Sequence, residues 1–466
     1  MKKSEDTSKT RRRGVPMALQ AIHPLVAGID IGSRQHWACG PAREDGKPNV
    51  RMFGTTTAEL HELVEWLASQ GTESVAMEST SVYWIPLFEL LQTRGIEATL
   101  VNARQMHNVP GRKTDFHDCQ WIQLLHSCGL LRGSFRPGVE ITAMRAIHRQ
   151  LTNLVEERSR CVQWMQKALD QMNVQVHKAV TDLTGVTGMA IIRAIVAGER
   201  DPVRLSAHRQ PNCQRSPEEI ARYLTGTWRD EHLFNLNFAL QFYDAVEKMI
   251  ASYEARLLEA IAALQPEERK DALVPDHPNH AKQRAIKAHG HQPTQTGLFR
   301  LLGVDLTRID GINVGAAKII LTEVGPDISA FPSEDNFVSW LKLCPFGPVT
   351  GGKPIKKKSK GFGSNRVAEA LRMAAVSLRY MKTALGAAYR RYARQHGADV
   401  AVFIMARKLA HLVYRMLRYG QDYIDIGEAA YESRFKAKRL AGLWETARSM
   451  GYTLTAQPTA ATAPVG

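Results

Sequence analysis

Two aspartates three residues apart are the first residues in the chain that suggest chemistry. Asp115 and Asp118 stand at the start of an expected helix, shortly after the basic pair Arg112-Lys113. Positions i and i+3 share one face of a helix, so the two carboxylates repel each other unless a cation lies between them. An ordinary solvated helix start is the alternative explanation for such a pair.

Two further acids each lie near the end of an apolar run. The run Leu25–Gly32 contains Asp30, and the run Ser74–Glu78 ends in Glu78. Such runs predict buried strands, and open α/β sheets present functional groups where strands end. Taken singly, Asp30 is explained equally well as a turn residue and Glu78 as a helix cap. Their recurrence at two strand ends favours a shared site.

Carboxylates gathered at one sheet edge repel each other unless a cation binds there. Hard divalent ions, Mg²⁺ above all, prefer oxygen ligands. One or two Mg²⁺ ions held by Asp30, Glu78, Asp115 and Asp118 would activate one oxygen and stabilise another in a phosphodiester displacement. The sequence therefore predicts metal-dependent chemistry on nucleic acid.

The residues around these acids predict an α/β domain at residues 21–138. Alternation and apolar runs indicate short strands, and a 3.6-residue period indicates helices between them. Strands are expected at Leu25–Gly32, Trp37–Gly40, Val50–Phe53, Ser74–Glu78 and Glu97–Val101, and helices at Ala58–Ser69 and Tyr83–Gln92. A basic loop then leads to the helix that carries Asp115.

Three of these motifs resemble a known family. Gly28–Ser33, Met77–Thr80 and Arg112–Asp118 resemble the D, E, D, D motifs of the DEDD insertion-sequence transposases of the IS-one-ten family. The resemblance implies a RuvC-like N-terminal domain with a ribonuclease-H-type sheet, in which the four acids bind metal. It also implies a DNA transposase or recombinase, acting on donor and target DNA and guided by a structured non-coding RNA, the bridge RNA.

A long apolar seam follows this first domain. Apolar residues recur at coiled-coil spacing from Ile141 to Val176, and a second helix with Phe238 and Met249 in its expected seam can pair with the first. A helix bundle within one chain is the alternative. We assign residues 139–264 to a coiled coil with a helical insertion at 181–235. The family resemblance implies that this coil joins subunits, so we expect a homo-oligomer, either a dimer or a tetramer.

The remainder of the chain predicts an all-α region. Residues 265–300 are rich in charge, proline and histidine and indicate a solvated linker rather than a metal site, and residues 301–445 indicate a helical C-terminal transposase domain. Within it, Leu306–Ile320 suggests a helix-hairpin-helix-like element, in which Gly311 and Gly315 bring helix amides close to a phosphate. An ordinary turn between helices is the alternative.

A loop in this domain combines a hydroxyl, two glycines and a lysine cluster. Thr350 is a reasonable nucleophile there, because nearby cations stabilise the charge that develops on a phosphate. From spacing alone, a loop that only grips phosphates is the favoured explanation. The stretch resembles the family's Ser-Gly-Gly-Lys loop, whose serine bonds covalently to DNA, and here Thr350 stands in place of that serine. The resemblance implies Thr350 as the nucleophile, either as a working threonine or as an attenuated or engineered variant. Displacement of the role to Ser359 or Ser364 is the less favoured alternative.

The basic residues predict how nucleic acid is held. The net charge of +15 favours a polyanionic partner. A row of arginines and lysines from Arg379 to Arg418 suggests a groove for it. The residues expected to bind nucleic acid are Arg112, Lys113, Gly311, Gly315, Lys318, Gly351, Gly352, Lys353, Lys356, Lys357, Lys358, Arg366 and Arg372.

Two other functions fit part of this pattern. A RuvC-type metal-dependent nuclease or junction resolvase needs the four acids but no hydroxyl nucleophile. A nucleic-acid-binding regulator needs neither.

The composition sets the remaining expectations. The six cysteines form no CxxC pair and no secretory signal is present, which predicts reduced thiols in a cytoplasmic bacterial protein. No apolar run is long enough to span a bilayer, so no membrane association is expected. Residues 1–20 suggest a disordered basic arm and residues 446–466 a disordered tail.

Overall fold

The computed structural model describes residues 21–43, 47–79, 81–102, 115–211, 213–344, 349–350, 353–354 and 365–455. The chain forms two compact units, Met1–Arg136 and Pro137–Gly466, and each is described by itself. In the described ranges, a search for helices of sufficient length and hydropathy to cross a membrane finds none.

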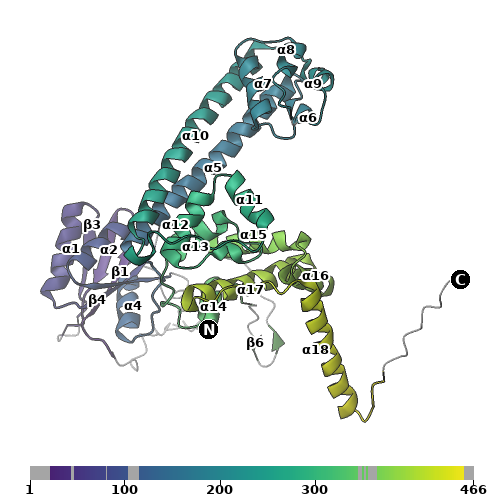
Figure 1. Ribbon diagram of the computed structural model, residues 1–466. Helices are drawn as coiled ribbons and strands as arrows, with labels where there is room; N and C mark the ends of the chain where they lie inside the picture. Colours follow the sequence, from purple (N-terminus) through teal and green to yellow (C-terminus); the bar gives the residue numbers. More distant parts are fainter. Residues whose placement is uncertain are drawn as a thin grey trace, which may run out of the picture. The chain divides into compact units, whose positions relative to one another are not determined.

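The first unit is built on a five-stranded sheet with strand order β3-β2-β1-β4-β5 (Figure 1). The strands are β1 (Val26–Ile31), β2 (Gln35–Cys39), β3 (Val50–Gly54), β4 (Ser74–Glu78) and β5 (Glu97–Val101). β1, β2 and β3 form an antiparallel meander, whereas β4 and β5 run parallel to β1. The expected α/β character of the N-terminal region is confirmed, and it is consistent with a ribonuclease-H-like domain.

The two faces of this sheet are covered by different helices. Ile29 and Met77 point toward α1 (Thr57–Ser69) and α2 (Trp84–Thr93), and the main core of the unit lies on that side. Successive strand residues point to opposite faces. Ala76 accordingly packs on the other side with Ile122 of α4 (Asp115–Ser127). The expected helix carrying Asp115 and Asp118 is therefore present, and it covers one face of the sheet.

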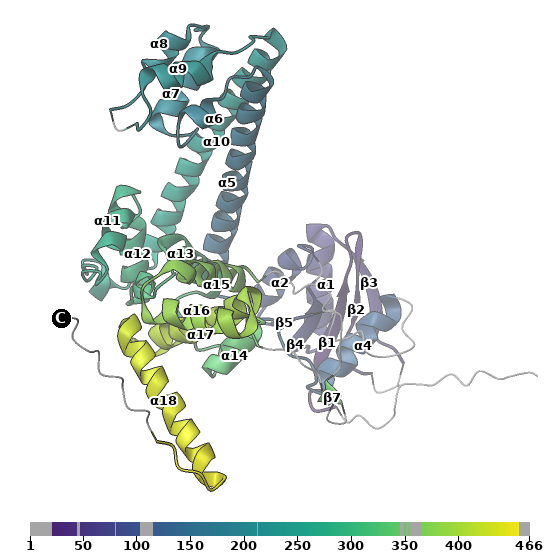
Figure 2. The same ribbon diagram turned by 90° about the vertical axis from the view of Figure 1, so that its right-hand side faces the viewer.

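The second unit begins with a pair of long helices. α5 (Val139–Gln171) and α10 (Asp230–Ala263) run antiparallel, as the views in Figures 1 and 2 show. Arg158 donates to Glu247 at 3.0 Å, and the rings of Trp164 and Phe242 stack at 6.1 Å. Four short helices connect the pair at its far end: α6 (Val176–Ala179), α7 (Val186–Val196), α8 (Pro202–Ser206) and α9 (Pro217–Leu224).

The rest of the second unit is helical, apart from one short hairpin, in the residues described. Its elements are η1 (Glu267–Arg269), α11 (His280–Ala288), α12 (Gln292–Leu302), η2 (Leu306–Arg308), α13 (Val314–Val324), α14 (Glu334–Trp340), β6 (Val349–Thr350), β7 (Lys353–Pro354), α15 (Arg366–Ser377), η3 (Leu378–Tyr380), α16 (Ala384–His396), α17 (Ala398–Tyr419) and α18 (Glu428–Ser449). α18 extends into the residues expected to form a tail, whereas residues 1–20 and 456–466 lie outside the described ranges.

The segment 265–300 differs from the solvated linker that its composition suggests. It contains α11 and α12, and His277 is buried. A ring nitrogen of His277 donates to Thr307 O at 3.0 Å, and Lys282 Nζ donates to Ile309 O at 3.3 Å. These side chains satisfy backbone carbonyls of the following segment, which lets a polar sequence pack against the domain.

A buried polar cluster joins α5 to α13. His148 Nδ1 donates to the Thr322 hydroxyl at 2.8 Å. Beside it, Glu323 accepts from Arg149 at 2.8 Å and forms an ion pair with Arg145 at 3.1 Å. Buried charges need such partners, because an unpaired one costs several kcal/mol. The cluster therefore fixes how the long helix leaves the C-terminal domain.

His148 makes the stability of this junction depend on pH. Burial lowers the pKa of His148 to about 4, and the nearby cations Lys318, Arg366 and Arg149 add to the shift. The unfolded chain therefore binds the additional proton between about pH 6.5 and pH 4, and stability falls as the pH falls through this window. We expect this one group to cost the protein about 2–3 kcal/mol at pH 4.5. Urea unfolding measured from pH 7 to pH 4.5 should show that the His148→Gln variant loses less free energy of unfolding than the wild type. An equal loss in both proteins would contradict the assignment to His148.

Candidate active site

Asp30 and Glu78 occupy equivalent positions on neighbouring parallel strands. β1 and β4 pair in register up to Ile29 opposite Met77, so the next positions are Asp30 and Glu78. Neighbouring strands lie about 4.8 Å apart, and residues at equivalent positions point to the same face. Both side chains are half-buried. The strand pairing thus brings two of the four predicted acids together.

Helix α4 lies over this same face and runs opposite to β1. Near its C-terminal end, Gln123 Nε2 donates to Val26 O at 3.5 Å, at the beginning of β1. His126 Nε2 lies 2.9 Å from Ser74 Oγ, at the beginning of β4. The N-terminal end of α4 is therefore directed toward the strand ends that carry Asp30 and Glu78.

The start of α4 lies at the level of Asp30. Burial raises the pKa of the Cys119 thiol to about 12, and the neighbouring Cys39 and Asp30 groups add to this shift. Asp118 precedes Cys119 directly, and Asp115 lies one turn earlier. The four-residue step from Cys119 back to Asp115 covers about 6 Å along the helix, and two residues of a strand cover about the same length. The fold therefore directs the beginning of α4, with Asp115 and Asp118, toward the same sheet edge.

The donor set fits a hard divalent ion. Carboxylate oxygens are the ligands that Mg²⁺ prefers, and it commonly uses only one or two of them together with water. A search of the described residues finds no cluster of three or more His, Cys, Asp or Glu side chains arranged as metal ligands. The side chain of Asp115 is not among those described. Asp30 and Glu78, in register on rigid strands, are the pair that the backbone brings together.

Thr350 belongs to the second unit, on a short hairpin. β6 and β7 pair antiparallel, with Thr350 opposite Lys353. The two residues between them are Gly351 and Gly352, a sequence typical of two-residue hairpin loops. Outside the described residues lie Arg112, Lys113, Gly351, Gly352, Lys356, Lys357, Lys358, Ser359 and Ser364, and the side chains of Thr350 and Lys353 are not described either.

The helix-hairpin-helix-like segment contains one 3₁₀ turn, η2, followed by α13. Gly311 has a φ of +86°, and a Cβ there would lie 2.6 Å from Ala374 O in α15. Glycine is therefore required by the packing inside this unit. Asn313 caps α13 by accepting from Ala316 N at 2.8 Å, which occupies one amide expected to face a phosphate. Burial lowers the pKa of Lys318, which is half-buried.

The other helical candidates lie nearby in sequence. Gly315 is exposed at the first turn of α13. Arg366 is half-buried at the start of α15, where Asn365 accepts from two backbone amides. The guanidinium of Arg372 lies 5.7 Å from the centre of the Phe403 ring.

Two transposase family models match the chain. One, a model of DEDD transposases of the IS110 type, matches residues 27–174, and the other, described as transposase IS116/IS110/IS902 family, matches residues 305–390. The chain belongs to the IS110 family of transposases. It is thus a DNA transposase or recombinase, and DEDD domains of this kind generally use divalent metals such as Mg²⁺. A comparison with curated proteins finds no match.

The basic row of the transposase is partly neutralised by the chain itself. Three of its cations have carboxylate partners that the sequence did not reveal: Arg407 pairs with Asp335, Arg415 with Glu334, and Arg390 with Glu428. Arg379 and Arg394 are exposed and have no ion-pair partner among the residues described. Acids distant in sequence therefore decide which arginines remain available for phosphates.

This distinction predicts different contributions to DNA binding. Each cation that neutralises a phosphate adds about 0.9 to the slope of log K against log salt. Arg379→Ala should lower the slope by about 1, because an exposed cation is lost. Arg415→Ala, whose side chain is already held by Glu334, should leave the slope nearly unchanged. Titrations of labelled duplex at several salt concentrations measure both, and equal effects would show that the internal ion pairs do not limit DNA contact.

Proposed function

We propose that this transposase cuts and exchanges DNA strands through a covalent bond between Thr350 and a DNA phosphate. One or two Mg²⁺ ions would be held by Asp30, Glu78, Asp115 and Asp118. The observation that carries the proposal is the register of Asp30 with Glu78 beneath the start of α4. The strand order β3-β2-β1-β4-β5 supports a RuvC-like domain at residues 21–138.

The chain's own residues perform the following steps. Bound Mg²⁺ supplies charge stabilisation for the oxygens of the reacting phosphate. The Thr350 hydroxyl gives up its proton to solvent, and its oxygen forms a bond to phosphorus. The bond between phosphorus and the leaving sugar oxygen breaks, and that oxygen takes up a proton from solvent. A sugar hydroxyl of the exchanged strand later attacks the phosphothreonine, which restores both the phosphodiester and the threonine.

Lysines close to Thr350 in the sequence support this proposal. Lys353 lies opposite Thr350 in the hairpin register, and the sequence continues with Lys356, Lys357 and Lys358. Positive charge at such a place stabilises the charge that develops on the phosphate. We further propose that base pairing with a structured bridge RNA selects donor and target, since phosphate contacts alone do not read sequence.

A covalent adduct tests the proposal. The purified protein, with the RNA that copurifies with it, is incubated with labelled DNA of the element's end and denatured. We expect a protein–DNA adduct that maps to Thr350 by peptide mass spectrometry, disappears in Thr350→Ala and persists in Thr350→Ser. Asp30→Asn should bind DNA yet form at least about 100-fold less adduct, because phosphate positioning is lost. Removing the RNA with ribonuclease before DNA is added should abolish the adduct on specific sites.

The matched controls are Ser359→Ala and Ser364→Ala. Both variants should retain the adduct, whereas an adduct mapping to either serine would refute the assignment of Thr350. Cleavage that continues in Thr350→Ala would instead support the second candidate function, a RuvC-type nuclease or junction resolvase that uses water.

We also propose that the transposase assembles into a homo-oligomer through the α5–α10 pair. The face of α10 that packs against α5 carries Leu236, Leu240, Tyr243, Val246 and Ile250. The sequence pattern placed Phe238 and Met249 in that seam, but the structure exposes them at 59% and 49%. α10 therefore has a second apolar face at helical spacing, which its own chain leaves open. Exposed apolar surface of this extent favours a protein partner.

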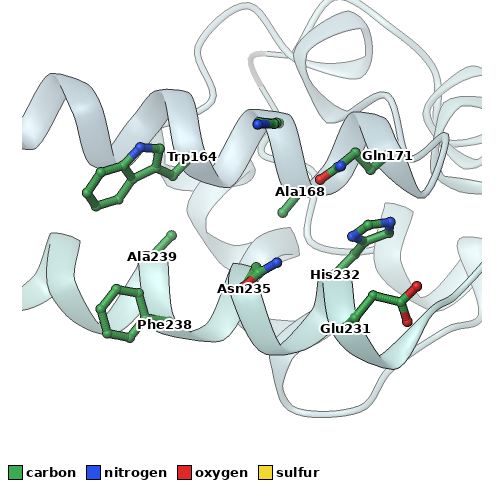
Figure 3. A pocket seen from close by; sticks show the side chains of 9 residues that line it. Trp164, Ala168, Gln171, Glu231, His232, Asn235, Phe238 and Ala239 are labelled. Carbon is green, nitrogen blue, oxygen red and sulfur yellow. The ribbon is translucent and has the colours of Figure 1, made fainter.

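A pocket between the two long helices adjoins this second face at Phe238, and its other end is polar, with Gln171, Glu231 and His232 (Figure 3). Figure 3 shows Trp164 of α5 and Phe238 of α10 at one end of it, with Ala168 and Ala239 between the helices. Trp164 is 44% exposed. The small alanines leave room beside two large exposed rings, a combination that suits side chains from a second copy.

Light scattering measures this association. Phe238→Glu places a charge in the proposed interface and should shift the mass from oligomer to monomer, because burying an unpaired carboxylate is costly. The control is Val203→Glu on α8, at a residue that is 67% exposed outside this face, and it should keep the oligomer. A wild-type protein that is monomeric with and without nucleic acid would exclude the interface.

A further inference from the structure

We propose that Gly28 is a positioning residue for the acidic site, because its missing side chain sets where α4 lies on the sheet. The proposal rests on the metal site proposed above and names a residue outside its four acids. It concerns the face of β1 that also carries Asp30, two residues further along the strand.

The packing at Gly28 is contact between main chains. A Cβ on Gly28 would lie 2.2 Å from Gln123 N and 2.5 Å from Cys119 O, both in the backbone of α4. Atoms at such distances overlap, and backbone atoms cannot rotate aside as a flexible side chain does. The φ of Gly28 lies outside the left-handed region. Glycine is therefore needed here for space and not for backbone conformation.

The C-terminal half of α4 is held in place independently. Ser127 O accepts from Ile22 N at 2.8 Å and from His23 N at 2.9 Å. The contact of His126 with Ser74 anchors the same half to β4. A methyl group at Gly28 would consequently lift the other half of the helix by about 1 Å, and displacements of that size at a reacting centre cost about 100-fold. That half begins with Asp115 and Asp118.

The second glycine of the motif has a different task. A Cβ on Gly32 would lie 2.5 Å from Gln35 O, within the turn that joins β1 to β2. Gly32 therefore shapes the chain after Asp30, whereas Gly28 controls the distance between layers. Of the two, only Gly28 contacts the helix that carries the aspartate pair.

Direct metal binding tests this proposal without relying on catalysis. Mn²⁺ binding to the full chain is measured by calorimetry in the absence of DNA, with Asp30→Asn as the reference for a lost ligand. Gly28→Ala should bind Mn²⁺ at least about tenfold more weakly, the range found when groups that orient metal ligands are removed. Hydrogen exchange of the α4 amides should accelerate in the same variant.

The matched control is Ile29→Val, on the adjacent residue. Ile29 points into the core beneath α1 and α2, on the opposite face of β1. Its truncation costs about 1 kcal/mol of stability but leaves the α4 contact untouched, so Mn²⁺ affinity should stay within about twofold of wild type. A merely structural role for Gly28 would make the two variants equivalent.

The outcomes separate this proposal from the metal site itself. If wild type and Gly28→Ala bind Mn²⁺ equally, the positioning role is overturned and the metal site stands. If wild type binds no better than Asp30→Asn, both proposals fall. Should Gly28→Ala not fold, His126→Ala replaces it, because this variant releases the C-terminal half of α4 from β4 without introducing a clash. This variant should weaken Mn²⁺ binding by about threefold or more, and unchanged binding would overturn the positioning role.

Discussion

The pairing of β1 with β4 in register is the constraint on which the proposed metal site of this transposase depends. Acids at one place destabilise the folded chain until a cation binds, so they must be carried by backbone that does not relax. Parallel strands held in register supply such backbone for Asp30 and Glu78. A helix laid directly on the same strands directs Asp115 and Asp118 to that edge. The core beneath α1 and α2 packs against the opposite face of this sheet.

The sequence predicted the elements that carry the acids with little error. β4 and β5 begin and end where they were predicted. The three central residues of β4 are buried and apolar, as expected for a strand covered on both faces. The contact between Gly28 and α4 could not be predicted in the same way. It joins residues nearly a hundred positions apart, and one sequence contains no signal for such pairing. The strands and the helix that carry the four acids were therefore predictable, but the packing of that helix on the sheet was not.

The second unit shows where periodicity alone misleads. α10 carries two apolar faces, and the sequence pattern placed Phe238 and Met249 in the wrong one. A helical period shows that apolar positions recur, but it does not show which face meets the neighbouring helix. The prediction of a solvated linker at residues 265–300 was wrong for another reason. His277 and Lys282 are polar, yet their side chains donate hydrogen bonds to backbone carbonyls of the following segment. In the basic row, acids distant in sequence neutralise some of the cations that composition suggests are free.

The substitution of threonine for serine at position 350 connects local structure with the proposed chemistry. A β-branched side chain suits a strand, and Thr350 is paired in β6. Its methyl group restricts χ1, which crowds the approach of a phosphate but also limits the orientations that the hydroxyl can adopt. Fixing a serine hydroxyl in one orientation costs more conformational entropy than fixing a threonine hydroxyl. The methyl group of threonine instead adds a steric cost at the attacked phosphorus. A restricted rotamer is an advantage for the proposed attack if it is the attacking one. Threonine is therefore compatible with the proposed role as nucleophile.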